Sequence, residues 1–179
     1  MKLILLLLLI PFFSYAQTVH IEKGKIEYQG TAKLKGISQE TLYERAKNAL
    51  LKHVNADKDE NNIDTNEKGT LKSNGKIRLS SPYSIIRTVH YTITINIDDG
   101  EYKYKIDSVF IKQKERGGKT KVIPSEDLVK DMETSGNVAI DAEKQLNEID
   151  MKFQKLIFLI NSTLKNHGKL KSGKNKNKV

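Results

Sequence analysis

The segment TVHYTITINIDDGEYKYKIDSVFI, residues 88–111, alternates between apolar and polar residues on both sides of Asp99-Gly100. Such alternation is typical of strands with one buried face, and Asp-Gly is a preferred turn between two paired strands. If Asp98 opposes Glu101, the apolar residues of both segments share one face. The predicted pairs are Ile97 with Tyr102, Ile95 with Tyr104, Ile93 with Ile106, and Val89 with Phe110.

Further strands and a helix are predicted before this hairpin. Residues 25–34 contain a strand candidate, and Ser38 is a suitable N-cap for a helix that ends near Asn55. Between residues 63 and 79 we predict three short strands, because Gly69 and Asn74-Gly75 interrupt the pattern and Asn-Gly favours a hairpin turn.

Helices are predicted after the hairpin. Residues 116–119 form a flexible link, and residues 124–128 resemble a helix start. A long helix follows over about 140–164, with one apolar stripe at helical spacing. Its stripe consists of Ala142, Leu146, Ile149, Phe153, Leu156, Ile160 and Leu164. Because the sheet has one apolar face that needs cover, we predict a two-layer α+β fold, an antiparallel sheet covered by helices.

The N-terminus has the pattern of an export signal. In MKLILLLLLIPFFSYA, residues 1–16, Lys2 precedes an apolar run, and Ser14 and Ala16 suit a cleavage site. The run is too short to cross a bilayer, which takes about 20 residues. We therefore expect a mature chain from Gln17, without a membrane span, in the periplasm or outside the cell. With 0 Cys residues, disulfides and cysteine chemistry are excluded.

The basic charge is concentrated in the C-terminal tail. The net charge is +9, but residues 165–179 hold six lysines and no acid. Removing these and Lys2 from the 31 basic residues leaves 24 against 22 acidic ones. Such a composition predicts a disordered tail, either a solubilising terminus or an electrostatic tether to an anionic envelope surface.

Three segments resemble a family of exported Bacteroidetes proteins of unknown function, described as a domain with a TATA-binding-protein-like (TBP-like) fold. They are LYERAKNALLKH at 42–53, EKGTLKSNGKI at 67–77 and TITINIDDGEYKYKID at 92–107. The predicted order β-α-β-β-β-β-α and the signal peptide add to the resemblance, which covers about residues 25–112. It supplies no catalytic residue, and a fold does not by itself carry a function.

The chain is therefore expected to divide into four parts. These are a signal peptide at 1–16, a TBP-like α+β domain at 17–115, a linker and C-terminal helical region at 116–164, and a disordered Lys-rich tail at 165–179.

The sequence contains no recognisable catalytic, cofactor-binding or metal-binding motif. The four His residues lack metal-ligand spacing, and nucleophile elbows, phosphate loops and dinucleotide fingerprints are absent. A near-neutral, exported body does not suit nucleic-acid binding. The candidate partner-binding face is the polar side of the sheet, with Lys76, Arg78, His90, Lys103 and Lys105.

We therefore expect a non-enzymatic envelope module that binds a protein or an anionic envelope ligand, with no cofactor. Two alternatives remain at this point, an envelope hydrolase acting on surface glycans and a self-associating structural protein.

Overall fold

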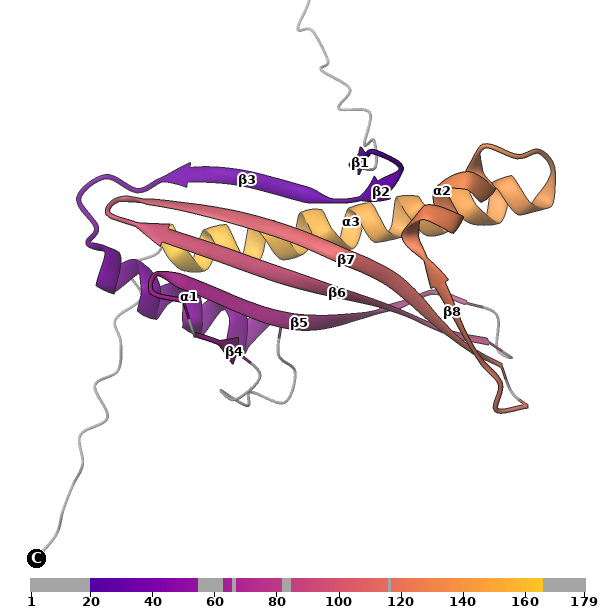
Figure 1. Ribbon diagram of the computed structural model, residues 1–179, viewed down its shortest axis with the longest axis horizontal. Helices are drawn as coiled ribbons and strands as arrows, with labels where there is room; N and C mark the ends of the chain where they lie inside the picture. The colour runs from indigo at the N-terminus through magenta and orange to yellow at the C-terminus, as the bar shows by residue number, and fades with distance from the viewer. Residues whose placement is uncertain (1–19, 55–62, 66, 82–84, 116, 166–179) are drawn as a thin grey trace, which may run out of the picture.

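The computed structural model describes residues 20–54, 63–65, 67–81, 85–115 and 117–165 (Figure 1). The predicted signal peptide, and the Lys-rich tail after Lys165, lie outside these residues. The described elements are β1 (Ile21–Glu22), β2 (Lys25–Ile26), β3 (Tyr28–Lys33), α1 (Gln39–His53), β4 (Ile63–Asp64), β5 (Thr70–Leu79), β6 (Ile85–Asp98), β7 (Glu101–Glu115), β8 (Thr120–Pro124), α2 (Ser125–Met132) and α3 (Asn137–Lys165).

The main sheet is antiparallel, with the strand order β3-β7-β6-β5-β4, and β8 pairs with β7. The pair β1 and β2 forms a separate hairpin. Helix α3 runs along the sheet, and α1 lies at the end where β6 turns into β7 (Figure 1). This architecture confirms the predicted α+β fold with an antiparallel sheet, covering helices and a long C-terminal helix.

The central hairpin has the predicted register near its turn. Asp98 opposes Glu101, and the three isoleucines at 97, 95 and 93 oppose Tyr102, Tyr104 and Ile106. The predicted pair of Val89 with Phe110 is wrong: Val89 opposes Ile111, and His90 opposes Phe110. The register shifts between His90 and Thr92 because β7 carries one extra residue there, a β-bulge.

The predicted turn at Asn74-Gly75 is also wrong, because β5 runs unbroken from Thr70 to Leu79. Gly75 pairs directly with Tyr91 on β6, and a Cβ at Gly75 would overlap the Tyr91 ring. The glycine therefore makes room for an aromatic ring that crosses it, a role that glycine takes in strands where groups approach closely.

The expected link after β7 differs from the structure. Gly118 donates a backbone hydrogen bond to Glu115, and Glu115 donates one to Lys119, so the segment closes a tight turn. Strand β8 follows at once and pairs with β7 from Thr120 to Pro124. The region after residue 115 thus contributes a strand to the main sheet, a role that its polar sequence did not indicate.

The core lies between the sheet and the helices. All residues of the predicted α3 stripe are buried, and Phe153 sits at its centre. Its ring meets Tyr28 of β3 and Tyr91 of β6 edge-on, at centroid distances of 5.2 and 5.0 Å. Tyr28 also donates a 2.7 Å hydrogen bond to the buried carboxylate of Asp150 on α3. Burial, and then this hydrogen bond, raises the pKa of Tyr28, so its hydroxyl stays protonated and can donate.

The turn between β6 and β7 anchors α1. Ser38 caps the helix, as predicted, and Asp99 accepts a 2.8 Å hydrogen bond from the backbone N–H of Gln39. The side-chain amide of Gln39 in turn donates a 2.7 Å hydrogen bond to the Ile97 carbonyl. No helix among the described residues has the length and hydropathy that a membrane crossing requires.

Candidate functional site

The face of the sheet away from the helices, here called the open face, carries all five residues of the predicted binding surface. On β5 and β6, Lys76 opposes His90 and Arg78 opposes Thr88. On β7, Lys103 and Lys105 oppose Asn96 and Thr94. Cross-strand partners point to the same side of a sheet, so the five side chains share one surface. They do not form one cluster, because the lysines at 103 and 105 lie nearer the β6–β7 turn.

Lys103 and Lys105 are neutralised by neighbouring carboxylates. The Lys103 ammonium lies 3.6 Å from Glu101. The Lys105 ammonium lies 3.2 Å from Glu27 and 3.4 Å from Asp107. The hydrogen bond to Glu27, followed by that to Asp107, raises the pKa of Lys105. These contacts offset the positive charges of both lysines.

The bulge adds two residues to the open face that the sequence analysis placed elsewhere or overlooked. Ser108 has a φ of 55°, and the pairing resumes with Phe110 opposite His90. Val109 and Ile111 consequently point into the core, at 6% and 1% exposure. Phe110 and Lys112 point to the other side, beside His90 and Thr88. The run Val109-Phe110-Ile111 was the sequence signal for this change of face. Strict alternation along the strand would bury the Phe110 ring and expose both β-branched neighbours to water.

His90 and Phe110 form a parallel stack on the open face. Their ring centroids are 5.0 Å apart and the rings are 7° from parallel. The Lys112 ammonium lies 5.9 Å from the Phe110 centroid, within reach of a cation–π interaction. Burial, then the charges of Lys112 and Lys76, lowers the pKa of His90, so the imidazole is neutral at pH 7.

These side chains define a surface that we call the cationic patch. Its members come from β5, β6 and β7 at the end of the sheet away from the β6–β7 turn. They are Lys76, Arg78, His90, Phe110, Lys112 and Lys114. Within the described part of the chain, none of its four Lys and Arg side chains forms an ion pair with a carboxylate. The patch therefore presents four uncompensated positive charges around an aromatic stack.

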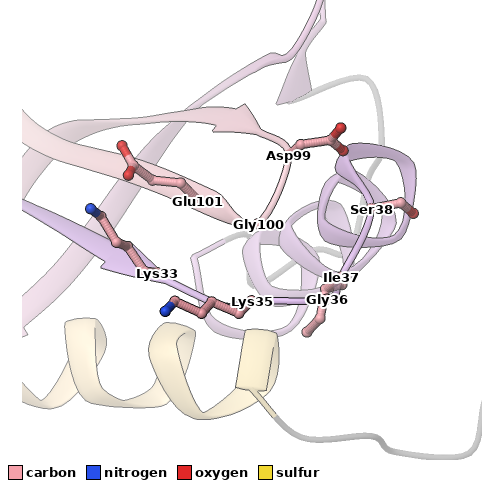
Figure 2. Close-up of a pocket in the computed structure, with 8 residues that line it drawn as sticks. All are labelled: Lys33, Lys35, Gly36, Ile37, Ser38, Asp99, Gly100 and Glu101. Atoms are coloured by element: carbon pink, nitrogen blue, oxygen red, sulfur yellow. The ribbon is translucent and has the colours of Figure 1, made fainter.

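A shallow hollow of about 580 Å³ lies where the β6–β7 turn meets α1 (Figure 2). It is lined by Lys33, Lys35, Gly36, Ile37, Ser38, Asp99, Gly100 and Glu101. In Figure 2 the Asp99 carboxylate points toward α1, where it accepts the Gln39 hydrogen bond. The Ser38 hydroxyl donates a 3.0 Å hydrogen bond to the Thr41 hydroxyl. Both groups hold the helix in place and are not arranged as a nucleophile with a base.

A smaller cavity of about 260 Å³ lies at the bulge, between β7 and α2. Its carboxylates include Glu27, which binds Lys105, and Glu126, which lies 3.1 Å from Lys25. A hydrogen bond from its own backbone N–H, and then one from Lys25, lowers the pKa of Glu126. An ionised, paired carboxylate of this kind is a poor general acid. Among the described residues, no three His, Cys, Asp or Glu side chains gather closely enough to hold a metal ion.

Comparison with known proteins agrees with the fold. Residues 28–112, from β3 into β7, match a family model described as a domain of unknown function (DUF4468) with TBP-like fold. This segment is similar to DUF4468 domains. The resemblance predicted from the three sequence segments is therefore confirmed. The matched region includes every member of the cationic patch except Lys114.

Two solved structures resemble the fold of this chain over most of its length. A TBP-like protein from Parabacteroides distasonis has a TM-score of 0.67 and 16% identity, over 83% of this chain and 97% of that one. A DUF4468 family protein from Bacteroides ovatus has a TM-score of 0.61 and 16% identity, over 85% and 92%. At this identity the likeness shows the fold alone. No curated protein matches the chain.

Proposed function

We propose that the protein is an exported, non-enzymatic binding module that holds an anionic partner of the cell envelope on its open face. The observation that carries this proposal is the cationic patch, whose four positive charges have no carboxylate partner among the described residues. Clustered cations of one sign attract and steer anionic ligands. The export signal at residues 1–16 supports a periplasmic or extracellular location.

The contacts of the carboxylates favour binding over catalysis. Most glycoside hydrolases use two carboxyl groups that face the substrate, one of them protonated. In the two hollows described above, Asp99 holds α1 and Glu101 lies near Lys103. Glu27 and Glu126 are each paired with a lysine. The hydrolase alternative therefore has less support than the binding module.

Charge reversal on the patch tests the proposal. Lys76→Glu with Lys112→Glu should weaken binding of a soluble polyanion, such as inorganic polyphosphate, far more than a matched control does, as measured by isothermal titration calorimetry. The matched control is Lys144→Glu with Lys155→Glu, which makes the same change in net charge at exposed positions of α3. Both variants alter exposed side chains, so their melting temperatures should stay close to wild type. Equal binding by the patch variant and the control would disprove the role of the patch.

Self-association is a second candidate, favoured by apolar side chains on the outer surface of α3. Ile140, Met151 and Phe158 are 64%, 53% and 69% exposed. They stand about three and then about two helical turns apart, so they follow one line along the helix. If this line pairs two copies, sedimentation velocity should detect a dimer that Phe158→Ser converts to a monomer. A wild-type chain that stays monomeric at every concentration would exclude this candidate.

A further inference from the structure

The cationic patch is bordered by exposed aliphatic side chains on the same face. Ile86 of β6 is 43% exposed and pairs with Lys114, while Val122 of β8 is 53% exposed and pairs with Lys112. Single exposed apolar residues are ordinary on protein surfaces. Here, however, each is the direct cross-strand neighbour of a lysine of the cationic patch, so apolar and cationic groups alternate over one small area.

The position of these residues in the fold brings them together at a projecting corner. The far ends of β6 and β7, with the turn into β8, extend away from α1 and the β6–β7 turn (Figure 1). This corner carries Ile86 and Val122, with Lys112 and Lys114 between them on β7. The His90–Phe110 stack lies on the next cross-strand row. The corner can therefore meet a flat surface with its aliphatic, aromatic and cationic groups at the same time.

We propose that the occupant of the cationic patch is the interfacial region of an anionic lipid surface. This inference rests on the proposed function and names the chemistry of the partner. Phosphate groups of lipids pair with cations, and the apolar border enters the region between headgroups and acyl chains. Lysine stems cover apolar surface while their charged ends stay with the phosphates. A soluble polyanion would satisfy the four charges but would leave Ile86 and Val122 without a role.

Vesicle co-sedimentation of the full mature chain tests the inference. The probes are phosphatidylcholine vesicles with and without phosphatidylglycerol, and inorganic polyphosphate serves as the soluble anion. The C-terminal lysines are present in every variant, so their contribution is the same throughout. We expect binding to vesicles that contain phosphatidylglycerol, little binding to pure phosphatidylcholine, and weakening as salt screens the charges.

Two variants separate the apolar and the electrostatic contributions. Ile86→Ser with Val122→Ser leaves every charge in place and should lower the vesicle partition coefficient about tenfold or more, while polyphosphate binding stays unchanged. Lys76→Glu with Lys112→Glu should lower it about 25-fold or more, since each cation near an anionic surface contributes about fivefold. The α3 control, Lys144→Glu with Lys155→Glu, should change it only slightly.

The outcomes distinguish this inference from the proposed function. If the serine variant binds phosphatidylglycerol vesicles as well as wild type does, the lipid surface is not the occupant. If polyphosphate binding is still lost in the glutamate variant, the general anion-binding function nevertheless stands. If the glutamate variant binds both the vesicles and polyphosphate as wild type does, both the proposed function and this inference are wrong. Thermal unfolding of each variant identifies any loss that comes from misfolding.

Discussion

Replacing Gly75 by alanine tests the packing of β5 on β6 at the point where sequence and structure differ. A Cβ at this position would overlap the Tyr91 ring, which is 3% exposed and meets Phe153 edge-on at 5.0 Å. The ring has no free volume to enter, and overpacking of this kind costs about 1–3 kcal/mol. Alanine in place of a strand glycine otherwise gains roughly 0.5–1 kcal/mol. The clash is larger, so we expect a net loss of about 1–2 kcal/mol.

Urea unfolding followed by circular dichroism measures this loss, and thermal unfolding should show a Tm lower by about 2–8 °C. The decisive comparison repeats Gly75→Ala in a Tyr91→Leu background. With the ring removed, the alanine should stabilise the strand, so the sign of the effect reverses. A loss of equal size in both backgrounds would instead indicate a turn at Asn74-Gly75, where glycine is needed for its backbone conformation, and would refute the packing argument.

Three further predictions each concern a single residue. Ser108→Gly should raise the Tm, with a gain of up to about 1 kcal/mol, because residue 108 has a φ of 55° that glycine adopts without strain; a lower Tm would contradict this. Tyr28→Phe should cost about 1–3 kcal/mol in chemical denaturation, because the buried Asp150 carboxylate loses its 2.7 Å hydrogen bond; an unchanged midpoint would show that the bond adds nothing. The pKa of His90, lowered in the free protein, should rise when polyphosphate occupies the patch, so affinity should increase as the pH falls below about 6.5. An NMR titration of the His90 ring measures this shift, and the same pKa with and without polyphosphate would place the anion elsewhere.

The sequence predicted the elements whose periodicity is strong and local. The register of the central hairpin near Asp99-Gly100 and the buried stripe of α3 both follow from spacing alone, because each element has one apolar face. The errors arose where a residue has two possible roles. Asn74-Gly75 favours a turn in isolation, and only the Tyr91 ring on the next strand shows why the glycine lies inside β5.

The candidate site was partly predictable for a similar reason. Alternation along β5 and β6 placed Lys76, Arg78 and His90 on the open face, where the structure has them. It could not show that Lys105 is neutralised by Glu27, because Glu27 precedes β3 and lies far away in sequence. It misplaced Phe110, because strict alternation was carried through the bulge although the run Val109-Phe110-Ile111 favours a change of face.

The extra residue at Ser108 acts as a phase shift for the outer part of β7. If Ser108 instead continued the regular alternation of β7, Phe110 and Lys112 would point toward the helices and Val109 and Ile111 into water. The chemical character of that corner is therefore set by the bulge as well as by which residues the strand contains. Deleting Ser108 would remove the bulge and leave Phe110 opposite His90, whereas drawing Ser108 into the regular alternation would replace the anion-attracting surface by an apolar one.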